Sequence, residues 1–448
     1  MKAVSSTLHI ALILIMTCAL TGVGRAQSQP SATYALTHAK IFTLAGSAVE
    51  DGTLIIHDGK IAAVGVGLDI PAGAQVIDAT GLQVYPGFFD SITQMGLREI
   101  GAVSATVDSN ETGSYNPDVV AATAVSPSSE HIPVTRAAGI TQVLAVPGSG
   151  GFDSAGSGGV IGGQASAIHL AGWTIDEMLI KKSAAMVLNW PEIETRTFDF
   201  ATFSRKEKPY SDAKQEYDKQ VNEITDWLER ARHYAQAMEK GSVARYDRDL
   251  KLEALTPVVR GELPLLVFAD RSREIRAAAD FCDKQRLRMI LAGGSEAYKV
   301  KDLLRSKGIP VILRPTLTSP LDEDDPYDRL LTQPAELAAA DVRFAFASFD
   351  NSFARRLGQN AANAVAYGLS YDEALRAVTV YPARIFGLDN QIGTIEPGKI
   401  ANLIVTNGDP LELTSDVRYL FIRGQLTPTN NRHKFLYEKY LNRPKPAN

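Results

Sequence analysis

The chain has 448 residues, of which 45% are hydrophobic and 22% charged, and its formal net charge is −5. This composition excludes a disordered chain, and the length is typical of two or three domains or of one barrel with additions. No block of lysine and arginine alternates with aromatic residues, so we expect no nucleic-acid partner.

The first 26 residues have the features of a secretory signal peptide. Lys2 supplies a positive start, an apolar run covers residues 8–24, and Gly24 and Ala26 are small residues suited to cleavage after Ala26. The alternative is a membrane anchor, but the run is short for a span, which takes ~20 apolar residues. We therefore expect a periplasmic or secreted protein that has no membrane segment once residues 1–26 are removed.

A single cysteine, Cys282, remains after this cleavage. One cysteine cannot form an internal disulfide, so packing has to stabilise the exported chain. Cys282 lies in the helical pattern AAADFCDKQ, which predicts a buried structural thiol.

Both ends of the chain are predicted to form short strands. Asp58 and Gly59 separate two apolar segments and predict a hairpin, because glycine accepts a positive φ. The far end repeats this pattern from Gly393 onward, with the motif GTIEPGKIANL at 393–403. Because neither end has enough strands to bury a core alone, we expect residues 33–85 and 391–430 to form one β-domain.

Apolar strand-like segments alternate with helical patterns between these ends. There are eight such segments, at 84–90, 140–146, 165–170, 185–190, 264–269, 287–292, 309–314 and 342–347. This alternation predicts an α/β fold over residues 86–390, with a parallel sheet closed into a (β/α)8 TIM-like barrel.

Three further segments exceed a minimal barrel. Residues 197–249 are highly charged and have helical spacing from Asp212 to Lys240, which predicts a helical insertion on or beside the barrel mouth. The glycine-rich stretch 148–163 lacks the lysine of a phosphate-binding loop, and we interpret it as a mobile loop at the mouth. Residues 431–448 form a C-terminal tail.

The segment VYPGFFDSITQMG at 84–96 carries the clearest family signal. It resembles the first barrel strand of the amidohydrolase superfamily, whose usual form is P-G-hydrophobic-hydrophobic-D-x-H-x-H. The two histidines of that pattern bind the catalytic metal, and their positions here hold Ile92 and Gln94. Because alternate residues of a strand share a face, Asp90, Ile92 and Gln94 are expected to point the same way.

Later strands extend the resemblance and the departures from it. The fifth strand resembles V-H-A-H-R, with Phe268 and Asp270 at the histidine positions. The sixth resembles L-V-H-G-T-E-A-Y, with Gly293 in place of the histidine. The eighth keeps Asp350, the acid that acts as base toward metal-bound water in the family.

The resemblance covers most of residues 34–430 and is closest to the secreted, imidazolonepropionase-related branch. It implies a small β-sandwich built from both chain ends, a barrel, and hydrolysis of non-peptide C–N bonds such as amides. The family norm is zinc, but the positions Ile92, Gln94, Phe268 and Gly293 have lost its histidines. We therefore expect no tightly bound metal.

Other polar residues are candidates for the mouth of the barrel. They are Asp270, Arg271, His169, Gln94 and Glu296. His169 is included because it ends the third strand, and the carboxyl ends of barrel strands carry function.

The residues leave several functions open. The first is a C–N hydrolase with Asp350 as its base, and the second is a non-catalytic protein that binds a small-molecule ligand or partners an active paralogue. A third is metal-free chemistry by the carboxylates of Asp270 and Asp350, which also suit a weak Mg²⁺ or Ca²⁺ site. The apolar side chains Ile92 and Phe268 favour the second. The sequence leaves open whether the chain forms a homo-oligomer.

Overall fold

The computed structural model describes residues 32–148, 158–199, 203–242, 244 and 247–444. The expected signal peptide and most of the glycine-rich stretch lie outside these residues. None of the helices in the described ranges is both long and apolar enough to cross a membrane.

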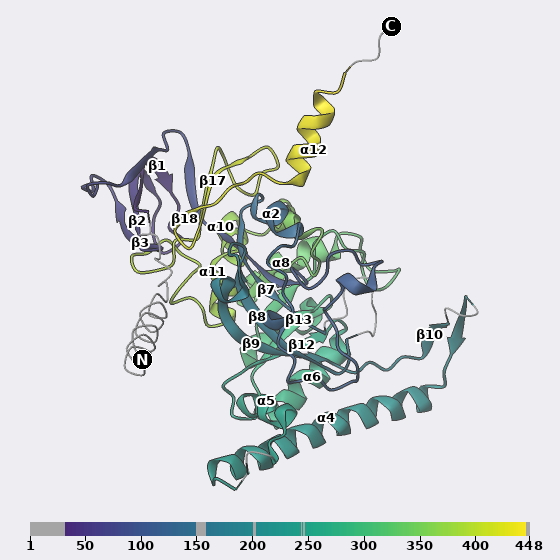
Figure 1. Cartoon of the computed structure of the whole chain (residues 1–448). Helices are drawn as coiled ribbons and strands as arrows, with labels where there is room; N and C mark the ends of the chain where they lie inside the picture. The colour runs from purple at the N-terminus through teal and green to yellow at the C-terminus, as the bar shows by residue number, and fades with distance from the viewer. Residues whose placement is uncertain (1–31, 149–157, 200–202, 243, 245–246, 445–448) are drawn as a thin grey trace, which may run out of the picture.

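Strands from both chain ends share one sheet, with the order β18-β17-β16-β5-β1-β2-β3 and with β4 paired to β1. In Figure 1 the purple N-terminal strands and the yellow C-terminal ones lie side by side. Antiparallel pairing of β5 with β16 joins the two ends. The strands are β1 (Tyr34–Ile41), β2 (Val49–His57), β3 (Lys60–Gly65), β4 (Gln75–Asp78), β5 (Gln83–Pro86), β16 (Leu403–Thr406), β17 (Val417–Ile422) and β18 (Gln425–Leu426).

The turn between β2 and β3 has the predicted chemistry. Asp58 and Gly59 both have positive φ, +48° and +76°, as a two-residue hairpin turn that matches strand twist requires. One face of the sheet buries a cluster that includes Leu36, Leu54 and Phe421. The sandwich form of this β-domain, and its boundaries, stay predictions.

The second large sheet is a nearly closed barrel of eight strands, in the order β15-β14-β13-β12-β9-β8-β7-β6. Each strand overlaps or adjoins one of the predicted segments. The strands are β6 (Phe88–Thr93), β7 (Ile140–Ala145), β8 (Ile161–His169), β9 (Leu179–Asn189), β12 (Leu265–Ala269), β13 (Met289–Gly293), β14 (Val311–Leu313) and β15 (Phe344–Phe346). The backbone N–H of Phe349 donates to the carbonyl of Ile92 at 2.9 Å and links the two edge strands.

The prediction of an all-parallel barrel is wrong for the third strand. Strand β8 runs antiparallel to both β7 and β9, whereas the other neighbouring pairs are parallel. The connection from β8 to β9 spans only residues 170–178 and holds one helical turn, α3 (Ile175–Met178). A parallel crossover takes a dozen or more residues, so this short link reverses the chain direction.

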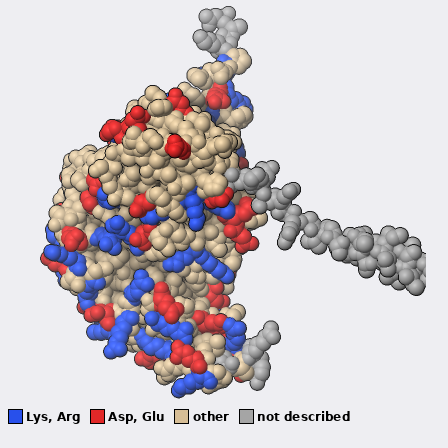
Figure 2. Space-filling model, turned by 90° about the vertical axis from the view of Figure 1, so that its left-hand side faces the viewer, with Lys and Arg blue, Asp and Glu red and all other residues tan. Residues whose placement is uncertain are grey.

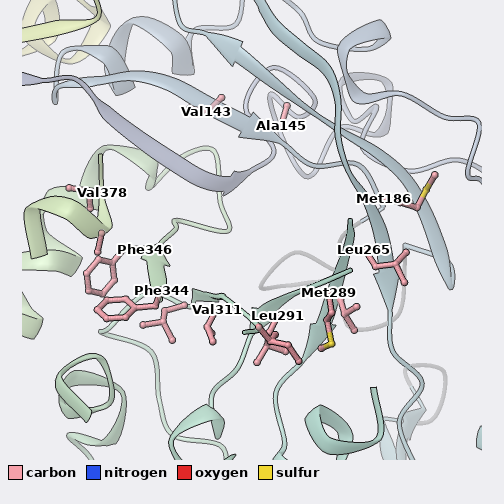
Figure 3. Packing of buried hydrophobic residues seen from close by; sticks show 14 of the residues in the cluster. Val143, Ala145, Met186, Leu265, Met289, Leu291, Val311, Phe344, Phe346 and Val378 are labelled. Carbon is pink, nitrogen blue, oxygen red and sulfur yellow. The ribbon is translucent and has the colours of Figure 1, made fainter. Parts of the chain in front are cut away.

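Helices cover the outside of the barrel, and the outward-facing side chains of the strands pack beneath them. Figure 3 shows this layer, with Val143, Met186, Leu265, Met289 and Phe344 from five different strands. The helices are α2 (His131–Arg136), α5 (Leu250–Val259), α6 (Ser272–Lys284), α7 (Lys301–Lys307), α8 (Arg329–Ala339), α9 (Leu357–Ala366), α10 (Tyr371–Ala377) and α11 (Val380–Ile385). Single 3₁₀ turns occur at Ser104–Thr106, Ala121–Thr123, Ala297–Val300 and Ala354–Arg356.

Helix α6 shows how the sequence pattern produces this packing. Its buried residues include Ile275, Ala278, Ala279 and Cys282, at the spacing that places side chains on one face of a helix. The thiol of Cys282 is buried as predicted, and burial raises its pKa to about 12. It is therefore protonated and unreactive at neutral pH.

Two elements extend from the body in Figure 1. The first is the insertion, where the hairpin of β10 (Arg196–Asp199) and β11 (Ser204–Glu207) precedes helix α4 (Tyr210–Glu239). The helix follows the predicted range closely, whereas the hairpin was not expected. Helix α4 packs along α5 and buries Ile224 and Leu228. The second element is α12 (Arg432–Leu441), which has no buried residue.

Candidate active site at the barrel mouth

Two of the four positions expected for metal ligands belong to an apolar cluster. Ile92 on β6 is 1% exposed and belongs to the cluster that fills the barrel interior, together with Val146 and Phe349. Phe268 on β12 packs against this cluster, with its ring 6.1 Å from that of Phe349 in an edge-to-face arrangement. Gln94, directly after β6, is also buried. Ile92 and Phe268 thus present apolar side chains at two of the expected ligand positions, and Gln94 presents an amide at a third.

Gly293 ends β13 in a conformation that a histidine would strain. Its φ is +95°, which side chains with a Cβ rarely adopt. A Cβ at this position would lie 2.8 Å from Oδ1 of Asp270. The Asp270 carboxylate therefore occupies the space that a side chain at position 293 would need.

Asp270 forms a bidentate salt bridge with Arg314, which directly follows β14. The Nε atom of Arg314 lies 3.0 Å from both carboxylate oxygens, and its Nη2 donates to Oδ2 at 2.7 Å. Ser295 donates to Oδ1 from its hydroxyl at 2.7 Å and from its backbone N–H at 3.1 Å. The two charged side chains are 18% and 20% exposed, so the pair is largely desolvated.

The electrostatics of this pair keep both groups charged. Burial opposes ionisation of Asp270, but the charge and hydrogen bonds of Arg314, with those of Ser295, outweigh it and lower the pKa of the carboxyl. Burial likewise opposes the charge on Arg314, and Asp270 outweighs it and raises the pKa of the guanidinium. Arg314 also lies 5.1 Å above the ring of Phe349, a cation–π contact.

Arg314 was not among the residues expected at the mouth. The signal that could have identified it is a lone arginine at the end of the apolar segment 309–314, where a strand meets the mouth. Arg271, which is adjacent to Asp270 in sequence, pairs instead with Asp322 at 3.0 Å. Both members of that pair are about 40% exposed, so it belongs to the rim of the barrel.

Two other predicted site residues are engaged in local structure. Glu296 is buried and accepts hydrogen bonds from the backbone N–H of Ser272 at 2.7 Å and from Lys299 at 2.8 Å. It thereby ties the start of α6 to the loop after β13. Asp350 lies in the loop after β15, and its Oδ1 accepts from the backbone N–H groups of Ser352 and Phe353. Its role as a base stays a prediction.

Asp90 is fully buried beneath the mouth and joins the first strand to the last. The hydroxyl of Ser348 lies 2.5 Å from Asp90 Oδ2 and 2.6 Å from the carbonyl oxygen of Asp350. The backbone N–H of Ser348 also donates to Asp90 Oδ1, at 2.9 Å, so one serine holds both carboxyl oxygens. Burial raises the pKa of Asp90 to about 7, against the lowering effect of hydrogen bonds from Ser348.

The prediction that His169 lies at the mouth is wrong. Because β8 runs antiparallel, His169 pairs with Gln142 near the start of β7, at the opposite end of the barrel. Asn402, from the predicted motif at 393–403, donates to Nδ1 of His169 at 3.1 Å and to Gln142 at 2.8 Å. Burial, followed by the charge of Arg423, lowers the pKa of His169 to about 3. The histidine is thus a neutral link between barrel and sheet.

The described residues at the mouth form no group of zinc ligands. Across the ranges that the structure describes, no three His, Cys, Asp or Glu side chains come together as a metal-binding group. The carboxylate of Asp270 is saturated by Arg314 and Ser295. A structural or catalytic zinc takes three or four nitrogen, sulfur or carboxylate ligands, and the described residues hold no group of that size.

Comparisons with known proteins relate the chain to amidohydrolases. The sequence model of the Amidohydrolase family matches residues 332–429. Amidohydrolase tasK of Hapsidospora irregularis is 25% identical over 400 residues, which is 84% of this chain but only 39% of that protein. D-hydantoinase of Geobacillus stearothermophilus is 45% identical over 65 residues, or 14% of this chain and 13% of that one. The chain therefore spans about two fifths or less of these curated relatives.

Solved structures extend the likeness to the whole fold. An amidohydrolase from Thermotoga maritima MSB8 is 26% identical, with a TM-score of 0.74, and the alignment covers 88% of this chain and 99% of that one. A protein described as a putative prolidase from Bifidobacterium longum is 16% identical, with a TM-score of 0.53, over 92% of this chain and 100% of that chain. At this lower identity the likeness shows the fold alone.

Proposed function

Because the chain belongs to the amidohydrolase superfamily, we propose that it is a metal-free member that binds a small molecule at the barrel mouth. The observation that carries this proposal is the largely desolvated Arg314–Asp270 salt bridge, in which Asp270 holds one of the positions expected for a metal-binding histidine. Ile92 and Phe268 place apolar side chains at two further positions expected for metal-binding histidines. We also propose that the chain descends from the secreted, imidazolonepropionase-related branch and is exported after cleavage near Ala26.

Hydrolysis of the family type needs a group that activates water. A bound metal does so by lowering the pKa of its water to ~7 and by polarising the substrate carbonyl. A guanidinium keeps its proton and cannot act as a base. Asp270 is held as a carboxylate against Arg314, so its basicity is low. Arg314 and Asp270 are therefore suited to recognition rather than to catalysis.

The same guanidinium suggests the chemistry of the ligand. Arginine has five N–H donors, and Asp270 engages those on Nε and Nη2, which leaves Nη1 to donate elsewhere. The ring of Phe349 lies against the guanidinium, and that of Phe268 packs against Phe349. A small amide or amino-acid derivative with a carboxylate or carbonyl oxygen suits a cation flanked by aromatic rings. Its oxygen would accept from Arg314.

A second candidate is a non-catalytic partner of an active paralogue. The observation that favours it is the length of tasK, in which the region similar to this chain is only 39% of a longer protein. A region that is fused to further sequence in one protein is a reasonable candidate for a separate subunit in another. On this alternative the barrel contributes a surface rather than a ligand site.

The deciding experiment measures metal content, turnover and binding in one preparation. The protein is purified without chelators, its metals are measured by elemental analysis, and hydantoins and dipeptides are screened for hydrolysis and for binding. We expect substoichiometric zinc, no turnover, and ligand binding that Arg314→Gln weakens. Arg276→Gln, on the exposed face of α6, is the matched control and should bind as the parent does. Stoichiometric zinc with turnover abolished by Asp350→Ala would overturn the proposal.

A further inference from the structure

A cavity of about 360 Å³ opens at the end of the barrel opposite the mouth. It lies where strands β12 to β15 begin, because Pro264, Met289, Pro310 and Arg343 line it. The Arg314–Asp270 pair lies at the carboxyl ends of the same strands. The cavity is thus separate from the proposed ligand site and makes no use of it.

The lining of this cavity is strongly basic. Four cationic side chains, Arg288, Lys307, Arg343 and Arg384, line it with a single acidic one, Asp283. The chain as a whole has a net charge of −5, so this concentration of positive charge is local. On the face shown in Figure 2, by contrast, basic and acidic side chains are interspersed.

Across the part of the chain that the structure describes, one of the four cations forms an ion pair within 4.0 Å, and Arg384 lies within electrostatic reach of Glu396. Lys307 pairs with Asp283 at 2.8 Å, which neutralises the acidic residue of the lining. Among the described residues, no carboxylate lies within ion-pair distance (4.0 Å) of Arg288, Arg343 or Arg384. Arg288 donates only a long bond of 3.4 Å to the carbonyl of Glu262.

These arginines converge from separate parts of the fold. Arg288 precedes β13, Arg343 precedes β15, and Arg384 lies in the last turn of α11. A fifth cation, Lys181 of β9, donates to the carbonyl of Phe386 at 3.0 Å next to this group. Burial and the charge of Arg288 lower the pKa of Lys181. Like charges held together repel each other, and a bound anion would relieve that repulsion.

We propose that this basal cavity binds a phosphorylated anion. Guanidinium groups form paired hydrogen bonds with phosphate oxygens, and three arginines match the two to three negative charges of a phosphate ester or a pyrophosphate. The cavity is larger than a phosphate group, and Ile290, Ile309 and Pro310 provide apolar contacts for an organic portion. The same chemistry occurs in soluble phosphate esters and in phospholipid headgroups.

A structural role for the basic residues is the competing explanation. The carboxyl ends of the barrel helices meet this face, and cations there balance helix dipoles. That explanation suits Lys307 in the last turn of α7 and Arg384 in that of α11. It does not suit Arg288 and Arg343, which lie outside helices. It also predicts that removing these charges lowers stability in the absence of any anion.

The test is anion binding by the full chain at constant ionic strength. Pyrophosphate and inorganic phosphate are titrated by calorimetry and by thermal shift, with sodium chloride as the reference salt. We expect saturable binding of pyrophosphate, weakened by roughly tenfold in Arg343→Gln and again in Arg384→Gln, since each removes a charge-assisted hydrogen bond. Arg305→Gln is the control, because Arg305 is exposed on α7 and does not line the cavity. It should bind pyrophosphate as the parent chain does.

Vesicles distinguish the two sources of phosphate. A lipid headgroup is indicated if the chain co-sediments with phosphatidylglycerol vesicles but not with phosphatidylcholine vesicles, and if Arg343→Gln abolishes this co-sedimentation. A soluble ester is indicated if the chain binds pyrophosphate but neither kind of vesicle. The proposal is overturned if pyrophosphate binds no better than chloride, or if it binds both glutamine variants as tightly as the parent. If Arg343→Gln does not fold, Arg343→Lys keeps the charge without the guanidinium fork. Arg343→Lys should bind pyrophosphate measurably more weakly than the parent chain does.

Discussion

Removal of Arg314 provides the sharpest test of the salt bridge at the mouth. In Arg314→Met the guanidinium is lost and Asp270 keeps only the two hydrogen bonds from Ser295. Breaking a buried ion pair by removing one partner costs about 3–5 kcal/mol. Because the pair is about a fifth exposed, we expect the lower end, about 3 kcal/mol. For 448 residues the entropy of unfolding is roughly 0.9 kcal/mol per kelvin, so Tm should fall by about 3 °C.

The double variant Asp270→Leu with Arg314→Met makes this prediction specific. It removes both charges and leaves side chains suited to the apolar cluster around Phe268, so most of the lost stability should return. Urea unfolding followed by circular dichroism measures each variant, and the coupling energy should reach about 2–3 kcal/mol.

The control for this cycle is a salt bridge that is similar in type but exposed. Arg271→Met breaks the pair with Asp322, whose members are about 40% exposed, and should cost less than about 1 kcal/mol. The reasoning is refuted if Arg314→Met costs no more than this control. It is also refuted if the double variant loses the sum of the two single losses.

Three other predictions concern buried groups and chain ends. Asp90 has a pKa of about 7 in the folded state and ~4 in the unfolded state, so between these pH values the folded state binds the extra proton. The free energy of unfolding should therefore fall by up to about 4 kcal/mol as the pH rises from 4 to 7. Urea unfolding across this range should show that Asp90→Asn removes that fall. His169 should have the opposite effect on the pH dependence of stability, because its pKa is about 3 in the folded state and ~6.5 in the unfolded state. The free energy of unfolding should fall as the pH drops below 6.5, by about 2 kcal/mol at pH 5. His169→Gln should remove this fall from the same pH profile. Deletion of residues 391–448 removes β16, the partner of β5, and should expose the core of the N-terminal strands to proteolysis; an unchanged digestion pattern would contradict their shared stability.

The elements of the barrel were largely predictable from local sequence. Each apolar segment from 84–90 to 342–347 corresponds to a strand because burial on both faces demands continuous hydrophobic residues. The hairpin at Asp58 and Gly59 and the amphipathic helix around Cys282 were also predictable, since turn chemistry and helical spacing act over a few residues. The apolar residues Ile92 and Phe268 at the positions expected for histidines were identified from the resemblance alone.

Strand direction and charge pairing depended on tertiary structure. The short link from β8 to β9 reverses the chain, and the direction of β8 places His169 in contact with Asn402 at the far end rather than at the mouth. Asp270 pairs with Arg314, 44 residues away, rather than with its neighbour Arg271. Sequence periodicity reports which side chains are buried, because burial is a property of each element. Which buried charges meet is decided only when separate strands bring their ends together, and the chemistry of this mouth depends on that meeting.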